Sequence, residues 1–74
     1  MKRVWIRFRG VKEINQFVIM LQGHDGEFDL RCGKYVVDAK SLLGIFSLDT
    51  SGWLEFVIYQ EDATIMEDLK PYRS

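Results

Sequence analysis

Three residues with metal-binding side chains occur together in the first half of the chain. His24, Asp25 and Glu27 supply an imidazole and two carboxylates, which are zinc ligands. A zinc site needs three or four ligands on fixed elements, whereas these three share one predicted loop, and no second cluster accompanies them. We therefore expect no bound metal and predict that His24 faces solvent.

The next stretch contains glycine and lysine, as phosphate-binding loops do. Six residues separate Gly26 from Gly33, whereas the phosphate-loop motif has four between its glycines. Tyr35 follows Lys34 at the position where that motif needs Ser or Thr to bind magnesium. The stretch also leads into a predicted strand instead of a helix, so we reject a phosphate loop.

Cys32 is the only cysteine and the only candidate for a reactive thiol. No histidine lies at a spacing that suggests activation, and Cys32 ends an inward-facing row of a predicted strand, so we expect a small core residue. Nothing in the sequence assembles a nucleophile, a base and an oxyanion donor. We expect no enzymatic activity and no cofactor. A single cysteine cannot form an internal disulfide, which fits a reducing cytosol.

Length and charge exclude further classes of protein. The chain has 74 residues, which predicts one domain over residues 1–74, and its formal charge of −1 argues against bulk attraction to nucleic acid or an anionic membrane. Its longest apolar run, Phe17–Leu21, is far shorter than the ~20 residues of a membrane span. No basic stretch followed by an apolar core opens the sequence. We therefore expect no signal peptide, no membrane contact and a cytoplasmic location.

The elements that position these residues follow from the spacing of apolar side chains. Alternation predicts half-buried strands, and apolar residues at i, i+3, i+4 and i+7 predict helices. We expect Gly23 to end the first helix in a left-handed conformation. The predicted elements are a strand over 2–9, a helix over 11–22, strands over 27–32 and 35–37, a short helix over 41–48, a strand over 53–59, and a last helix that begins at 61–62 and stops at Pro71.

The order is therefore β-α-β-β-α-β-α. Because every strand alternates, one face of the sheet is covered and the other is open to water. Helices on one face of a four-stranded, mostly antiparallel sheet form an α+β open-faced sandwich, which is the fold class we predict.

Aromatic and basic residues would share the open face of this sheet. The first strand places Arg3, Trp5, Arg7 and Arg9 outward, and the fourth places Trp53, Glu55, Val57 and Tyr59 outward. Three interpretations stay open if these strands are neighbours. The arginines pair with Glu27, Asp29 and Glu55 across strands; the face binds an oligomer or protein partner; or it binds single-stranded nucleic acid, which the net charge disfavours.

Residues 38–48, Asp-Ala-Lys-Ser-Leu-Leu-Gly-Ile-Phe-Ser-Leu, carry a resemblance to a known family. They closely resemble the regulatory-serine region of HPr, the histidine-containing phosphocarrier protein of the phosphoenolpyruvate-dependent sugar phosphotransferase system. That region has the pattern Lys-Ser-hydrophobic-hydrophobic-Gly-hydrophobic-x-Ser-Leu, and every position matches. The β-α-β-β-α-β-α order is also that of the family, so the resemblance implies an HPr-like domain.

The resemblance also implies functional residues. In HPr the serine at the position of Ser41 heads the short helix, and in many Gram-positive bacteria a dedicated kinase phosphorylates it; unmodified, such a serine is a good helix cap. The helix forms the family's docking surface, to which Lys40, Leu42, Leu43 and Phe46 correspond here. The implied partners are a phosphotransferase-system enzyme, the HPr serine kinase or a transcription regulator.

One departure from the family bears on the chemistry. HPr carries its phosphate on a histidine within Gly-x-His-x-Arg-Pro at the start of the first helix. Residues 10–15 here read Gly-Val-Lys-Glu-Ile-Asn and have no histidine. We expect an HPr-like binding or regulatory module that acts through the Ser41 helix and does not carry phosphate on histidine. The alternatives are a homodimer that buries Arg3, Trp5, Arg7, Trp53 and Tyr59, and nucleic-acid binding by the same face.

Overall fold

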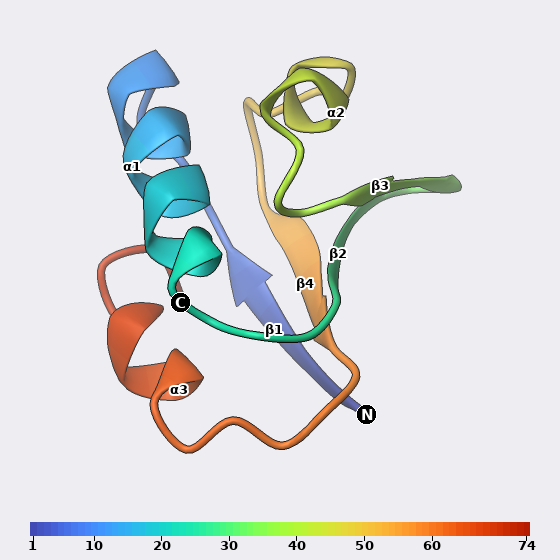
Figure 1. Ribbon diagram of the computed structural model, residues 1–74. Coiled ribbons are helices and arrows are strands. Elements are labelled where there is room, and N and C mark those ends of the chain that lie inside the picture. Colours follow the sequence, from blue (N-terminus) through green and yellow to red (C-terminus); the bar gives the residue numbers. More distant parts are fainter.

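The computed structural model describes residues 1–74 and contains four strands and three helices. In chain order they are β1 (Lys2–Ile6), α1 (Val11–Gln22), β2 (Phe28–Cys32), β3 (Tyr35–Asp38), α2 (Leu42–Phe46), β4 (Leu54–Ile58) and α3 (Ile65–Asp68). Figure 1 shows the helices gathered on one side of the sheet. The predicted order of elements is confirmed.

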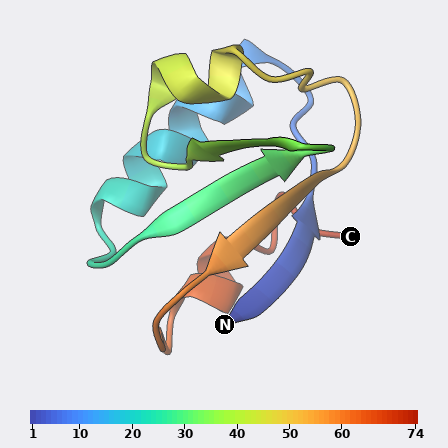
Figure 2. The same cartoon turned by 90° about the vertical axis from the view of Figure 1, so that its right-hand side faces the viewer.

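The strands form one antiparallel sheet in the order β1-β4-β2-β3. The first and fourth strands are neighbours, with Arg3 opposite Val57 and Trp5 opposite Glu55. Figure 2 views the molecule from the sheet side, with the helices behind. The α+β open-faced sandwich predicted from the alternation is therefore confirmed.

The core lies between the sheet and the helices, and aromatic rings fill its centre. Phe17 on α1 is fully buried and meets three rings edge to face, with centroid distances of 5.0 Å to Phe8, 5.5 Å to Phe56 and 5.2 Å to Tyr72. Edge-to-face contacts of this kind add to the free energy of burial. They fix α1 across the sheet, and with it the position of the loop from Arg7 to Gly10.

The helix ends differ in detail from prediction. The bounds of α1 are as predicted, but Gly23 has φ −80°, which is right-handed, so the expected left-handed stop is wrong. The amides of Gly23 and His24 instead bond to carbonyls of the last turn, and no left-handed residue is needed. The helix α3 begins later than predicted, because the Asp62 carboxylate accepts the amides of Thr64 and Ile65 and holds residues 62–64 as a cap.

The two sheet edges are finished in different ways. Residues at the carboxyl end lie along β1: the Arg7 amide donates to the Tyr72 carbonyl at 2.8 Å, and Ile6 and Arg73 form an antiparallel bridge. The strand predicted over 2–9 therefore ends at Ile6, where the chain pairs with residues 72–73 instead. The other edge is β3, which joins β2 through a tight turn with Gly33 at φ 60°, a conformation that favours glycine. None of the three helices has the length and apolar composition of a membrane-spanning segment.

Candidate functional site

Ser41 heads α2 as predicted. Its Oγ accepts the amide of Gly44 at 3.0 Å, which is the hydrogen bond of a helix N-cap. A Cβ at position 44 would lie 3.2 Å from that Oγ and 3.3 Å from the Cβ of Val37, so glycine lets the helix approach β3 closely. The cap and the glycine together fix which side chains of this short helix face outward.

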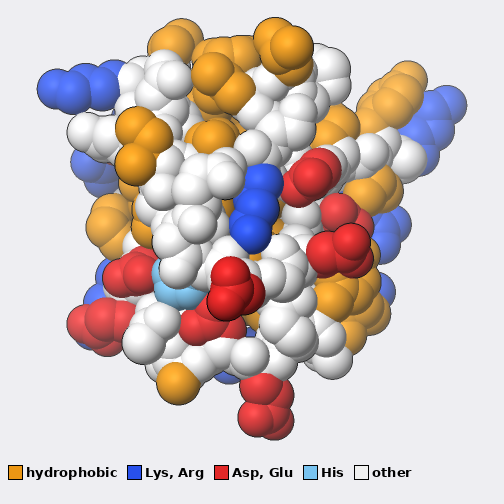
Figure 3. All heavy atoms as spheres, viewed as in Figure 1, with side chains coloured by type: hydrophobic (Ala, Val, Ile, Leu, Met, Phe, Trp, Pro, Cys, Tyr) orange, Lys and Arg blue, Asp and Glu red, His pale blue; other side chains and the backbone are white.

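The exposed apolar side chains of α2 are Leu43 and Phe46. Leu43 is 84% exposed and Phe46 is 43% exposed, while Ile45 between them is fully buried. Leu42 is half-buried and packs against the core. Two of the predicted docking residues are therefore free to contact a partner, and Figure 3 shows hydrophobic side chains at the end of the molecule formed by α2 and the start of α1.

Lys40, also predicted to dock a partner, is used inside the fold. Its Nζ donates to the carbonyl of His24 at 2.6 Å and lies 5.6 Å from the centre of the Phe28 ring. The first contact holds the segment before α2 against the end of α1, and the second holds it against β2. Lys40 thus positions the Ser41 helix and does not lie on its exposed side.

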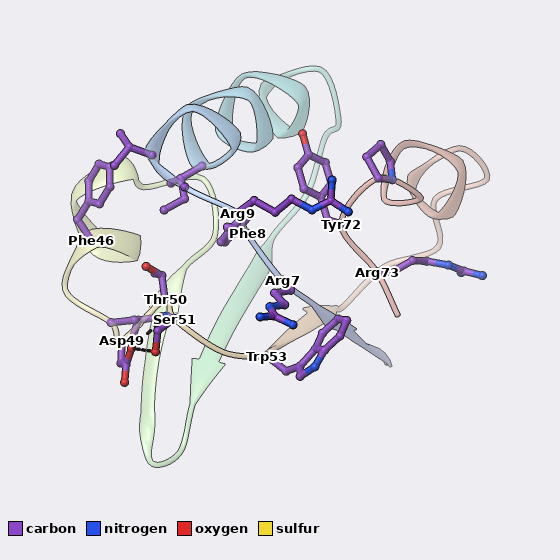
Figure 4. A pocket seen from close by; sticks show the side chains of 15 residues that line it. Arg7, Phe8, Arg9, Phe46, Asp49, Thr50, Ser51, Trp53, Tyr72 and Arg73 are labelled. Atoms are coloured by element: carbon purple, nitrogen blue, oxygen red, sulfur yellow. Dashed lines mark hydrogen bonds between the residues drawn. The ribbon is translucent and has the colours of Figure 1, made fainter.

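A groove of about 1010 Å³ adjoins the exposed side of α2. Phe46 and Val11 line one part of it, and Arg7 and Arg9 line another; Figure 4 shows both guanidinium groups in the groove and Arg73 directed away from it. The Arg7 guanidinium lies 5.7 Å from the centre of the Trp53 ring. Arg7 was predicted on the open face, but Val11 and the groove were not predicted, because only the fold brings the start of α1 beside α2.

The groove is positively charged. Neither Arg7 nor Arg9 forms a salt bridge, and the backbone amide of Val11, the first residue of α1, makes no hydrogen bond within the chain. Asp49 is the single carboxylate that lines the groove. It accepts hydrogen bonds from the hydroxyl and the amide of Ser51, and these bonds, that of the hydroxyl above all, hold the pKa of Asp49 below its usual value. Glu13 in the first turn of α1 accepts the Arg9 amide at 3.0 Å and offsets the positive end of that helix. An acidic ligand in the groove would therefore be attracted by the two guanidinium groups, which have no salt-bridge partner.

The open face carries the predicted aromatic residues and Arg3, whereas Arg7 and Arg9 line the groove. Trp5, Trp53 and Tyr59 are exposed there. The predicted cross-strand pairing of Arg3, Arg7 and Arg9 with carboxylates is wrong, because none of the three forms a salt bridge. Glu55 instead lies 3.5 Å from Arg31 on the neighbouring strand.

Asp29 and Val57 occupy the middle of this face. Asp29 accepts a hydrogen bond from the Tyr59 hydroxyl at 2.6 Å, a bond that raises the pKa of the Tyr59 phenol. Val57 was predicted to face water but is 1% exposed, because side chains of the flanking strands β1 and β2 cover it.

The prediction that His24 faces solvent is wrong. The imidazole is 8% exposed, with Nδ1 at 2.7 Å from the Asp62 carboxylate and Nε2 at 2.8 Å from the Asp68 carboxylate. In Figure 3 the single histidine lies among acidic side chains. His24 therefore fastens the end of α1 to α3, and it does not belong to the groove.

The geometry around His24 requires a protonated ring. Each carboxylate accepts a hydrogen bond, so both ring nitrogens must donate, which only the imidazolium can do. Burial by itself lowers the pKa of His24, but the hydrogen bonds to Asp68 and Asp62 and their charges outweigh burial and raise the pKa above its usual value. The two carboxylates bind opposite ring nitrogens, so they do not face a common position where a metal ion could lie. No group of three His, Cys, Asp or Glu side chains is arranged to hold a metal ion.

Comparison with known proteins finds no match for this chain among family models, curated proteins or solved structures.

Proposed function

We propose that this protein is a cytoplasmic, HPr-like docking module of the sugar phosphotransferase system, which binds an acidic surface of a partner protein. The surface that we propose consists of Leu43 and Phe46 on α2 together with Arg7 and Arg9 in the adjoining groove. The observation that carries the proposal is the exposure of Leu43, which is 84% on a helix whose Ile45 is fully buried. The sequence resemblance of residues 38–48 to HPr supports the same assignment.

The shape of the surface favours a protein over a small molecule. Leu43 projects from a convex helix, where a small ligand would leave most of it in water, whereas a partner protein can enclose it in a pocket. The groove beside it supplies unpaired positive charge at Arg7 and Arg9. An apolar anchor flanked by cations matches an acidic partner surface with an apolar pocket.

Ser41 is suited to regulate this binding. Phosphorylation would place close to two negative charges beside Leu42 and Leu43, at the edge of a surface that we propose to bind acidic groups. The added charge would repel the same partner that the guanidinium groups attract. Docking and its control would thus lie on one short helix.

Phosphate transfer through histidine is not part of the proposal. The groove contains no histidine, and His24 has both ring nitrogens bound to carboxylates on another part of the molecule. An imidazole held in this way has no free nitrogen lone pair to accept a phosphoryl group.

Intact-mass measurement after two incubations tests the regulatory role. We expect no added phosphate with phosphoenolpyruvate and the general phosphotransferase enzyme, and one acid-stable phosphate with ATP and the HPr serine kinase. The Ser41→Ala variant should lose that phosphate. An acid-labile phosphate in the first mixture would overturn the non-carrier assignment, and no phosphate in the second would remove the proposed switch.

Substitution of the exposed leucine tests the docking surface itself. Leu43→Glu is expected to weaken calorimetrically measured binding to the general phosphotransferase enzyme or the HPr serine kinase by about 30-fold, which is the loss at an interface hot spot. Ile19→Glu is the matched control, because Ile19 is an exposed apolar residue outside the groove. Equal binding by both variants, or no binding of either protein by the unsubstituted chain, would contradict the proposed function.

A further inference from the structure

The register of the sheet arranges the charges of the open face in an ordered way. Two rows of side chains cross the four strands in the order β1, β4, β2, β3. The first row is Arg3, Val57, Asp29 and Asp38, and the second row is Trp5, Glu55, Arg31 and Val36. The first row runs from a cation to two carboxylates, so the β1 side is positive and the β3 side is negative.

The outer members of these rows have no charged partner within the chain. Arg3 makes no salt bridge, and neither does Asp38, whose carboxylate only accepts the Lys40 amide at 2.9 Å. In the second row the exposed outer residues, Trp5 and Val36, are apolar. Each row therefore ends in groups that a complementary surface could satisfy.

From this pattern we propose that the open face binds a second copy of the same chain in an isologous dimer. Consider a two-fold axis that lies between the two sheets and runs parallel to the strands. Each row of one copy then lies opposite the same row of the other copy, with the order of its residues reversed. Arg3 of one copy then faces Asp38 of the other, and Trp5 faces Val36. Because the axis relates the copies, each of these contacts forms twice.

The inner members of the rows also fit this arrangement. Glu55 of one copy faces Arg31 of the other, which extends the pair they already form within each chain. Val57 faces Asp29, whose carboxylate already accepts the Tyr59 hydroxyl, so no isolated charge meets Val57. Two sheets in this arrangement pack about 10 Å apart and nearly aligned, as in β-sandwiches.

The other symmetric arrangement is disfavoured by charge. A two-fold axis perpendicular to the strands would place β1 against β1, so that Arg3 faces either Arg3 or Trp5 of the other copy and Asp38 faces either Asp38 or Val36. Neither position of the axis gives Arg3 or Asp38 a partner of opposite charge. Single-stranded nucleic acid is disfavoured in the same way, since Asp29, Asp38 and Glu55 would face its phosphates. A second copy of the chain, in contrast, places a carboxylate opposite Arg3 and a guanidinium group opposite Asp38.

Charge exchange between two variants tests the dimer directly. A four-stranded face is small, so we expect a weak dimer whose mass by sedimentation equilibrium rises from 8.7 kDa towards twice that value between about 10 µM and 1 mM. Arg3→Asp and Asp38→Arg should each weaken self-association at least about tenfold, because each places like charges opposite one another. An equimolar mixture of the two variants should form a heterodimer, since both contacts are then between opposite charges.

Controls separate this result from misfolding and from docking at α2. Circular dichroism verifies that each variant is folded, and Ile19→Glu on the helix side should dimerise as the parent does. Leu43→Glu should also dimerise normally, which separates this proposal from the docking surface. A monomer at 1 mM, or no recovery in the mixture, would overturn the dimer. Binding of a labelled single-stranded oligonucleotide at low salt that Trp5→Ala abolishes would replace it.

Discussion

Phe17→Ala is expected to lower the free energy of unfolding by about 4 kcal/mol, the largest effect that we predict for any single substitution. A domain of this size has a total stability of about 4–11 kcal/mol, so the variant should be close to unfolding at room temperature. Phe17 is fully buried and its ring contacts Phe8, Phe56 and Tyr72. Alanine would leave a cavity that three rings from different elements cannot fill together.

Urea unfolding followed by circular dichroism measures this loss. Ile19→Ala is the control, because Ile19 lies on the exposed side of the same helix and its replacement should change stability by less than about 0.5 kcal/mol. A loss below about 1 kcal/mol for Phe17→Ala would mean that the contacts among these rings contribute little to the free energy of unfolding.

His24→Gln is expected to lower stability by about 2 kcal/mol at pH 6, with a difference from the parent that shrinks as the pH rises. Because the folded pKa of His24 is raised, its contribution is complete below the unfolded pKa of about 6.5 and is lost as the pH passes through the folded value. Burial raises the pKa of Asp62, but hydrogen bonds from Thr64 and His24 outweigh it and lower the pKa overall. The contribution of Asp62 is therefore lost only in acid, below its usual value.

Thermal unfolding of parent and variant from pH 5 to pH 9 measures the effect. The difference in Tm should be largest between about pH 5 and 6.5 and should decrease above that range. Asp25→Asn is the matched control, since Asp25 is an exposed neighbour whose carboxylate makes no hydrogen bond or salt bridge with His24. A difference in Tm that stays constant across this range would contradict an imidazolium held between two carboxylates.

Local sequence patterns were enough to predict most of the fold. Apolar spacing gave the bounds of α1, and alternation placed Ile6 and Phe56 in the core. The side chains whose burial was predicted wrongly depend on distant parts of the chain. The partners of His24 lie 38 and 44 residues away in the sequence, so no local pattern could show that a loop histidine is buried. Val57 is covered because it lies in a central strand, which alternation alone does not reveal.

The candidate site was predictable only in part, for a similar reason. The motif at residues 38–48 indicated Leu43 and Phe46, but it also indicated Lys40, whose charge the fold uses elsewhere. A helix of five residues is too short for its spacing to distinguish exposed positions from half-buried ones. Arg9 was expected on the open sheet face, and only the end of β1 at Ile6 turns it into the groove beside α2.

The strand order also determines when the protein can fold as it is synthesised. The strand β1 leaves the ribosome first, yet its sheet neighbour β4 is made last of the four strands and is also the only link between β1 and the β2-β3 hairpin. Nascent chains that end before Leu54 can form α1 and the hairpin, but they leave the apolar side of β1 uncovered. Long-range pairing of this kind makes folding slower than in helical proteins of equal length. Synthesis must therefore extend beyond β4, at Leu54–Ile58, before β1 can join the sheet.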